Sequence, residues 1–198
     1  GWAYRYSMEA MLFADATGYS RLTEEQIPLF FEHYMGAIAE LNRATEYKAV
    51  HIETAGDGLY MVFDDTDSAA HYALELSELI TAQDWSRYGL PEELSIRIGL
   101  HCGPVFVGRD PVTEHPLYSG THTSRTARIE PITPPGQVYA SSAFAAVTSA
   151  HQVEGLRFSY IGRTRLAKHY GILPLYHVKR DRRQVPVDKS SVSAVQAS

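Results

Sequence analysis

Residues Val50–Phe63 read VHIETAGDGLYMVF, two short apolar runs on either side of a Gly-Asp-Gly turn. Valine, isoleucine, tyrosine and phenylalanine favour extended strands, and the two glycines supply the backbone freedom that a tight turn between strands needs. The segment therefore predicts a β-hairpin that presents Asp57 at its tip.

The segments on both sides extend this hairpin into a regular alternation. Upstream, Ser7–Ala14 predicts a buried strand, and apolar residues between Ile27 and Leu41 recur at helical spacing. Downstream, Asp65–Thr81 predicts a second helix, and Leu94–Cys102 predicts a strand with alternating apolar positions. The order β-α-β-β-α-β is typical of a ferredoxin-like α+β core, in which helices pack on a mostly antiparallel sheet.

The rest of the chain predicts additional C-terminal α and β elements around this core. These are an irregular connection with an edge strand (Gly103–Gly120), a helix (Thr121–Ile129), a strand (Val138–Ser141), a short helix (Ala143–Thr148) and two closing strands (Phe158–Gly162 and Leu173–Val178). We expect one domain over residues 1–180. An Arg-Asp-Arg-Arg cluster at 180–183 marks the end of this domain, and residues 181–198 form a polar C-terminal tail.

The composition narrows the class of protein. Among 198 residues, 44% are apolar and the formal net charge is -5, which argues against a nucleic-acid binder with a basic face. The single cysteine, Cys102, lies in a strand-like apolar run, so we expect it to be buried and inert. No apolar run approaches the roughly 18 residues of a membrane span, and no signal-peptide pattern is visible. We therefore expect a cytoplasmic protein with neither a membrane nor a nucleic-acid partner.

Two carboxylates stand out by their positions. Asp15 ends the first apolar strand and Asp57 sits at the hairpin tip, and in a ferredoxin-like sheet these strands are neighbours. Paired carboxylates suit Mg²⁺ or Mn²⁺, which commonly bridge substrate phosphates, and the loop Ala16–Ser20 could cradle phosphates with its backbone N–H groups. The alternative is that both aspartates only cap turns.

Four segments in order resemble the catalytic domain of class III nucleotidyl cyclases. They are LFADATGYSRLT (12–23), HIETAGDGLYMVF (51–63), SIRIGLHCGPVFVG (95–108) and GTHTSRTARI (120–129). The resemblance extends from about Phe13 to Val178. It implies a two-metal enzyme that converts a nucleoside triphosphate into a 3′,5′-cyclic nucleotide and pyrophosphate.

The resemblance also implies roles for individual residues. Two divalent cations, Mg²⁺ or Mn²⁺, would bind at Asp15, Ala16 and Asp57. Arg128 matches the arginine that steadies charge on the α-phosphate, and Ser124 stands where the family has an asparagine. The other implied substrate positions are the phosphate loop (Thr17, Gly18, Tyr19, Ser20), the base-reading positions Glu53 and Leu117, and Lys168 or Arg165 for the terminal phosphates.

In this family the site lies between two subunits, so the resemblance implies a homodimer with two shared active sites. One chain would supply the metal aspartates, and the other would supply the base-reading and transition-state residues. The alternative from another functional class is a non-catalytic, cyclase-like module that binds a nucleotide or only dimerises. The serine at position 124, in place of the family asparagine, favours this alternative.

The base-reading positions depart from those of adenylyl cyclases. Glu53 replaces the lysine found four residues before the second metal aspartate, and Leu117 replaces a polar partner and offers no hydrogen bond. Glu53 could accept from guanine, as in a guanylate cyclase, or from uracil or cytosine. The stretches HTSRTARIEPITPPGQVYAS and RLAKHYGILPLYHV are similar to pyrimidine cyclases of Pycsar antiphage defence. UTP or CTP is therefore the favoured substrate, and a separate effector protein would read the cUMP or cCMP product.

Overall fold

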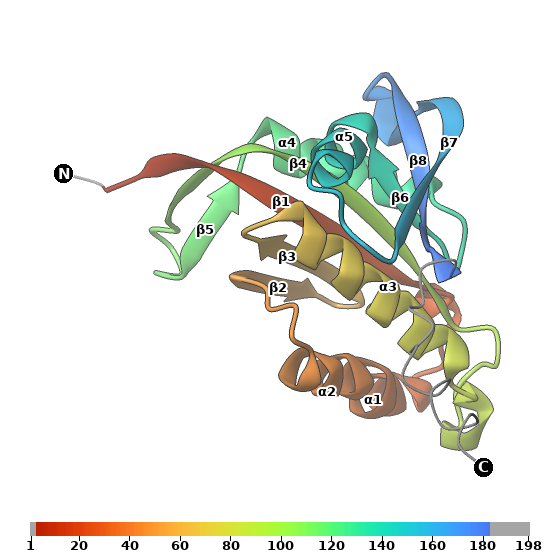
Figure 1. The fold of residues 1–198 in the computed structure, drawn as a ribbon. Coiled ribbons are helices and arrows are strands. Elements are labelled where there is room, and N and C mark those ends of the chain that lie inside the picture. Colours follow the sequence, from red (N-terminus) through yellow and green to blue (C-terminus); the bar gives the residue numbers. More distant parts are fainter. Residues whose placement is uncertain (1–2, 183–198) are drawn as a thin grey trace, which may run out of the picture.

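The computed structural model describes residues 3–182, which form an eight-stranded, mostly antiparallel sheet with helices on both faces (Figure 1). The strands are β1 (Arg5–Thr17), β2 (His51–Ala55), β3 (Gly58–Phe63), β4 (Ser95–Arg109), β5 (Pro116–Ser119), β6 (Val138–Ser141), β7 (Leu156–Arg165) and β8 (Ile172–Arg180). The α-helices are α1 (Gln26–Leu29), α2 (Gly36–Ala44), α3 (Thr66–Ala82), α4 (Thr121–Ile129) and α5 (Ser142–Ala150). None of the helices within residues 3–182 is long and apolar enough to cross a membrane.

The sheet has the strand order β2-β3-β1-β4-β6-β8-β7, with β5 paired to β4. Its first four strands, with the helices between them, are the ferredoxin-like β-α-β-β-α-β core, so the predicted fold class is confirmed. The later strands extend the sheet beyond β4, and only the β4–β6 pair is parallel. Of the expected tail, residues 183–198 lie outside the described part of the chain.

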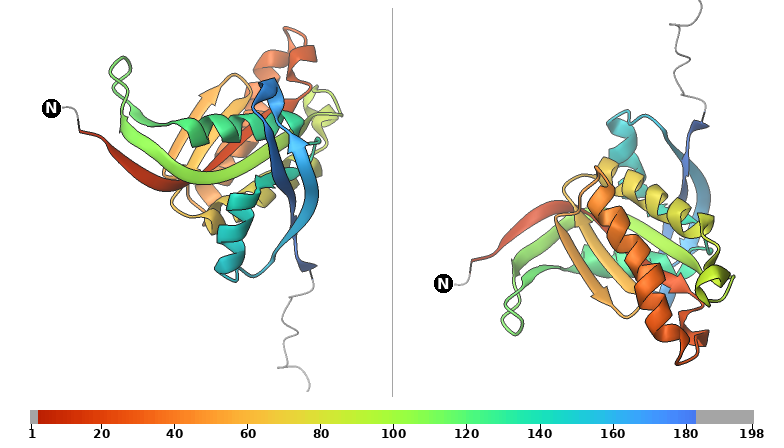
Figure 2. Two further views of the ribbon diagram at one scale, coloured as in Figure 1. Left: turned by 90° about the horizontal axis from the view of Figure 1, so that it is seen from above. Right: turned by 90° about the horizontal axis from the view of Figure 1, so that it is seen from below.

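The central strands are longer than the sequence pattern indicates. β1 pairs with β4 along its full length, from Arg5 opposite Val107 to Thr17 opposite Ser95. The prediction of an irregular connection from residue 103 is therefore wrong for Gly103–Arg109, which continues β4. The reason is tertiary, because the distant N-terminal half of β1 supplies the hydrogen-bonding partners for this stretch. Figure 2 shows both outer halves extending away from the body of the sheet.

The two faces of the sheet carry different helices. Leu12 and alternate residues of β1 point to one face of the sheet. There they pack with α3 and with Phe30 and Tyr34 of the first helical region, and these residues together form the main core. Met11 points the other way, into a smaller cluster with Val62 and Val105, where α4 lies against it. This side also carries the open surface beside the β2–β3 hairpin, because α4 covers only part of it (Figure 2).

A continuous helical region, residues 26–44, supports one end of the sheet. A π-helical stretch, Phe30–Met35, joins α1 to α2, and such stretches often occur near functional sites. Within it, Phe30 and Tyr34 are fully buried and stack at 4.5 Å, and the Tyr34 hydroxyl donates to the Ser95 carbonyl at 2.9 Å. Burial, together with the charges of Asp57 and Asp15, raises the pKa of Tyr34.

Burial shifts the pKa values of two groups in β4. Cys102 is buried, as its apolar run predicts, and burial raises the pKa of its thiol to about 11, which disfavours the reactive thiolate. His101 is 2% exposed, and its imidazole lies 2.6 Å from the Ser141 hydroxyl and 2.9 Å from the ring of His122. Burial, then the positive charges of His122 and Arg125, lowers the pKa of His101 to about 3.

The neutral state of His101 predicts loss of stability in mild acid. Its folded pKa lies below the unfolded value of about 6.5, so its stabilising contribution is present above pH 6.5 and is lost as the pH falls toward 3. We expect the stability difference between wild type and His101→Gln to shrink by about 1.4 kcal/mol per pH unit in this range. Urea unfolding at pH 7, 5.5 and 4.5 measures it, with the exposed His115→Gln as control. A stability difference between wild type and His101→Gln that does not change with pH would contradict the lowered pKa of His101.

Candidate active site

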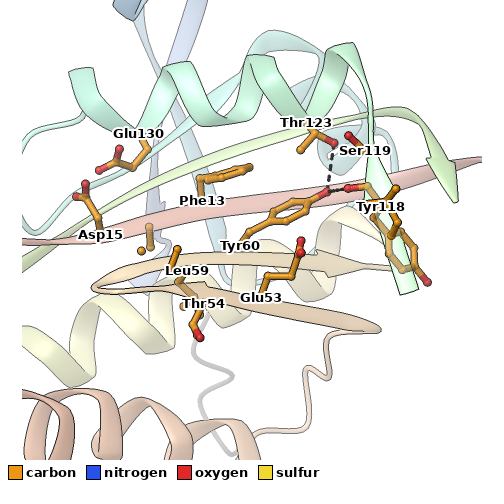
Figure 3. Close-up of a pocket in the computed structure, with 14 residues that line it drawn as sticks. Phe13, Asp15, Glu53, Thr54, Leu59, Tyr60, Tyr118, Ser119, Thr123 and Glu130 are labelled. Carbon is orange, nitrogen blue, oxygen red and sulfur yellow. Dashed lines mark hydrogen bonds between the residues drawn. The ribbon is translucent and has the colours of Figure 1, made fainter. Parts of the chain in front are cut away.

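A cavity of about 460 Å³ opens on the same side of the sheet as α4, where the helix leaves part of the sheet uncovered (Figure 3). β1, the β2–β3 hairpin, β5 and the two ends of α4 form its walls. Its lining residues are Phe13, Ala14, Asp15, Glu53, Thr54, Ala55, Gly58, Leu59, Tyr60, Leu117, Tyr118, Ser119, Thr123 and Glu130. The cavity has an acidic end at Asp15 and Glu130, an aromatic middle, and a second end between Glu53 and Tyr118 (Figure 3).

Strand register creates the acidic end. Asp15 in β1 lies directly opposite Arg97 in β4, and an Arg97 guanidinium nitrogen is 3.4 Å from the Asp15 carboxylate. Another nitrogen of Arg97 is 3.4 Å from Glu130, and a third donates to the Pro131 carbonyl at 3.0 Å. Arg97 thus ties the first aspartate to the segment that follows α4.

Gly99 allows the third carboxylate to approach. A Cβ atom on Gly99 would lie 2.8 Å from the Glu130 backbone nitrogen, so only glycine lets the end of α4 rest on β4. Glu130 is consequently 7% exposed and faces Asp15 (Figure 3). Burial first, then a hydrogen bond to Asp15 and the charge of Asp15, raises the pKa of Glu130 strongly.

The hairpin tip brings in the second aspartate. Burial, and then the charge of Asp15, raises the pKa of Asp57, while backbone N–H groups of Asp57 and Ala16 and the charge of Arg97 oppose this shift. The tertiary structure therefore places Asp15 and Asp57 within electrostatic reach, with one arginine facing three carboxyl groups. Such a site attracts a cation.

The donor set fits hard divalent cations. The carboxylates of Asp15 and Asp57 and the backbone carbonyl of Ala16 offer the oxygen ligands that Mg²⁺ and Mn²⁺ prefer. Within residues 3–182, no group of three or more His, Cys, Asp or Glu side chains is arranged to enclose a metal ion by itself. Two carboxylates alone suit ions that take their remaining ligands from water and substrate phosphates.

The loop after Asp15 is a tight turn. Gly18 has a left-handed backbone (φ 95°) and precedes a short 3-10 turn, Tyr19–Arg21. Tyr19 packs edge-on against Phe30 at 4.9 Å, so its side chain anchors the loop to the core and leaves only its backbone for a ligand. Ser20 is exposed, and the Thr17 hydroxyl is buried without a hydrogen-bond partner.

Aromatic side chains form the middle of the cavity. The rings of Phe13 and Tyr60 stack at 4.6 Å. The Tyr60 hydroxyl donates to the Tyr118 carbonyl at 3.0 Å and lies 3.2 Å from the Thr123 hydroxyl, which links the hairpin to β5 and α4 (Figure 3). Burial raises the pKa of Tyr60 to about 12, so this hydroxyl stays protonated.

The second end of the cavity holds the positions expected to read a base. Glu53 on β2 is half exposed and points into the cavity, and Leu117 on β5 lines it as well. His51 lies two residues before Glu53 on the same strand face and packs on Tyr118 at 4.8 Å. A polar side chain thus stands at only one of the two expected base-reading positions.

The remaining predicted residues lie elsewhere in the protomer. Ser124 is exposed on α4. Arg128 is half-buried in its last turn, and its side chain makes no hydrogen bond or ion pair with residues 3–182. Lys168 and Arg165 are exposed at the β7–β8 connection, where Lys168 has a left-handed backbone (φ 54°). None of these four side chains lines the cavity that contains Asp15. One protomer therefore does not assemble the full predicted set.

Three residues of the site were not singled out by sequence reasoning, namely Arg97, Glu130 and His51. Arg97 and Glu130 stand inside the quoted motifs, but their charges meet Asp15 only through the β1–β4 register and the position of α4. Arg97, a charged residue between the apolar positions Ile96 and Ile98, was a usable signal. It indicated the sheet face opposite the core.

Comparisons with known proteins bear on the family and the fold of the chain. The sequence model of the family described as "Adenylate and Guanylate cyclase catalytic domain" matches residues 3–171. Adenylate cyclases of Mycosarcoma maydis and Neurospora crassa are each 27% identical to the chain, over 106 and 117 residues. These matches cover 46% and 51% of this chain but only 4% and 5% of those proteins, so the chain spans about a twentieth of their length.

Solved structures share the fold. The adenylyl cyclase CyaB from P. aeruginosa has a TM-score of 0.78 at 17% identity, covering 91% of this chain and 98% of that one. The guanylate cyclase domain of RhGC from Catenaria anguillulae, in complex with GTP, has a TM-score of 0.73 at 20% identity, covering 90% and 100%. At such identities the likeness establishes the fold alone.

The raised pKa of Glu130 predicts an alkaline weakness in the metal-free protein. A carboxyl group whose folded pKa exceeds its unfolded value stabilises the fold fully below the unfolded pKa and loses this contribution as the pH rises. We expect Glu130→Gln, which mimics the protonated acid, to gain about 1 kcal/mol or more over wild type between pH 5 and pH 8. Urea unfolding in EDTA at both pH values measures the gain.

The exposed Glu93→Gln is the control for this experiment, because its carboxylate is solvated in both states. A Glu130→Gln difference that is the same at pH 5 and pH 8 would show that Glu130 is ionised throughout. In that event the raised pKa of Glu130 at the acidic end of the cavity would be wrong.

Proposed function

This chain belongs to the adenylate and guanylate cyclase catalytic domain family, the class III nucleotidyl cyclases, and we propose that it cyclises a pyrimidine nucleoside triphosphate. UTP or CTP would yield cUMP or cCMP and pyrophosphate. The observation that carries the proposal is the cavity itself, which has Asp15 at one end, with Asp57 of the hairpin tip within electrostatic reach, and the Glu53 carboxylate at the other end.

The reaction is an in-line phosphoryl transfer. The ribose 3′-oxygen forms a bond to the α-phosphorus, the bond from that phosphorus to the bridging oxygen of the pyrophosphate breaks, and the 3′-hydroxyl proton leaves to solvent. Two Mg²⁺ or Mn²⁺ ions held by Asp15, Ala16 and Asp57 would supply charge neutralisation and a more acidic 3′-hydroxyl.

Protein groups contribute positioning and charge. Arg97, already at the acidic end, offers a guanidinium to the phosphates once cations neutralise Asp15. The backbone of residues 17–20 lies at the same end, beside Asp15, and its N–H groups would bind phosphate oxygens. Arg128 would steady charge on the α-phosphate, the Ser124 hydroxyl would take over the contacts of the family asparagine, and Lys168 would face the terminal phosphates, with Arg165 as the competing candidate.

A homodimer explains why one protomer holds only part of this set. Ser124, Arg128 and Lys168 lie outside the cavity of their own chain, and Arg128 has no partner among residues 3–182. Tyr6 and Met8 on the outer half of β1 are 70% and 62% exposed, which is typical of an apolar contact surface. We propose that a second copy supplies these groups, so that two equivalent sites form between the subunits.

Substrate choice rests on the far end of the cavity. Glu53 cannot donate to adenine N1, and Leu117 adds no polar contact, which disfavours ATP. The Glu53 carboxylate can accept from the N3–H of uracil or from the amino group of cytosine. The same segments that resemble pyrimidine cyclases of antiphage defence make second-messenger synthesis for a separate effector the proposed biological role.

Product identification tests the reaction directly. The protein is incubated with each of the four triphosphates and Mn²⁺, and products are identified by mass. We expect cUMP or cCMP, and Asp57→Ala should lower the rate at least about a hundredfold because one metal position loses its ligand. Cyclic GMP instead would make the chain a guanylate cyclase. No product from a folded dimer would favour a non-catalytic module.

Subunit mixing tests the shared site. Asp57→Ala and Arg128→Ala disable opposite halves of each site, so each variant alone should be inactive. In a mixed dimer one site carries both changes and the other is intact, and random pairing should restore about a quarter of wild-type activity. Failure of the mixture to regain activity, with subunit exchange verified, would place both residues in one protomer's site.

A further inference from the structure

A histidine that the proposed reaction does not use lies behind the base-reading end of the cavity, against Glu53 and Tyr118. His51 and Glu53 lie two residues apart on β2, so both side chains leave the same face of the strand. Glu53 is paired with Tyr60 across the hairpin, and His51 with Val62. The strand geometry thus holds the imidazole beside the carboxylate expected to contact the base.

Aromatic packing fixes the imidazole. The His51 side chain is only 9% exposed. Its ring lies over Tyr118 at 4.8 Å, inclined by 32°, and meets Tyr60 edge-on at 6.2 Å. Because β3 and β5 supply these neighbours, His51 has little freedom to turn away from Glu53.

This packing holds one ring nitrogen of His51, Nε2, close to the Glu53 carboxylate. His51 Nε2 is buried and lies 3.2 Å from the Glu53 Oε2 atom, but the two are not aligned as a hydrogen bond, and Nε2 has no other partner in residues 3–182. A buried ring N–H without an acceptor is unfavourable. A small rotation of the half-exposed Glu53 carboxylate would let Oε2 accept from Nε2 when this nitrogen carries the ring proton, and would leave Oε1 for the cavity.

We propose that His51 is a positioning residue that holds one oxygen of Glu53 and thereby makes the site select against guanine. The inference rests on the proposed function, because it assigns a base to the same cavity. Guanine presents N1–H and its 2-amino group side by side, which suits both oxygens of a carboxylate. With Oε2 turned toward His51, the two carboxylate oxygens no longer face the base together, so only one of these donors meets the carboxylate, and the Leu117 side chain offers no acceptor for the other.

Uracil and cytosine do not need two carboxylate oxygens at this position. Uracil has one donor, N3–H, between two carbonyl oxygens, and cytosine has one amino group on this edge, so a single free carboxylate oxygen serves either base. His51 therefore accounts for discrimination that Glu53 alone does not provide, since an unrestrained carboxylate would accept guanine at least as well.

The test compares binding and turnover in three proteins. Wild type, His51→Leu and His51→Gln are titrated by calorimetry with α,β-methylene analogues of the four triphosphates, in which the bond to be broken is replaced, and kcat/KM is measured with the natural triphosphates. In His51→Leu we expect the preference for the guanine over the uracil nucleotide to rise about tenfold, the size of one hydrogen bond. His51→Gln, whose amide can donate to Glu53, should return it toward wild type.

A matched histidine controls for general effects. His33→Leu removes an imidazole that stacks on Tyr88 at 4.3 Å, away from the cavity, and should leave the base preference unchanged. Circular dichroism confirms that each variant is folded. The readout is the ratio between bases, which a merely structural defect would not change.

The outcomes separate the two proposals. An unchanged guanine-to-uracil ratio in folded His51→Leu overturns the role of His51 while the cyclase proposal stands. If the analogues bind selectively but no cyclic product forms, the proposed reaction is overturned. The ratio of guanine to uracil analogue binding then still tests the role of His51. A wild type that prefers the guanine analogue, or that binds none of the four, overturns the inference.

Discussion

The pairing of β1 with β3 on one side and β4 on the other is the constraint on which the site depends. β1 lies at the centre of the ferredoxin-like core, and its antiparallel neighbours deliver the hairpin tip with Asp57 from one side and Arg97 from the other. Because side chains alternate along a strand, the register that buries Leu12 and Ala14 among the helices also points Asp15 to the opposite face. A slip of one residue would reverse this arrangement.

Electrostatic strain follows from that register. Burial first, and then the proximity of Asp15, raises the pKa values of Asp57 and Glu130, while the single nearby arginine, Arg97, lowers them. In an unliganded fold this is a cost to stability, since like charges repel at short range in a partly buried site. Bound cations would reverse the sign of the interaction, so the same carboxylates that weaken the empty fold favour a metal-loaded state.

The cavity also separates two tasks along its length. The acidic end is built on the central strands, where the backbone is held on both sides, whereas Glu53 and His51 sit on β2, the strand at the edge of the sheet. An edge strand can accept side-chain changes with little effect on the core. Under the proposed function, base preference would therefore vary without disturbing Asp15 and Asp57. α4 connects the two ends of the cavity. Thr123, near the start of this helix, contacts Tyr60, and Glu130 follows the last residue of the helix.

The sequence by itself determined the order of elements, the hairpin with Asp57 at its tip, the limits of the helix Thr121–Ile129 and the neighbourhood of Asp15 and Asp57. These depend on periodicity, turn chemistry and the short connections of the ferredoxin-like core, all of which are local. Only the tertiary structure decided the extension of β4 to Arg109, the contact of Glu130 with Asp15, and the burial of His51 against Tyr118. Each joins segments far apart in the chain, and their register and packing are set by the whole sheet rather than by neighbours in sequence.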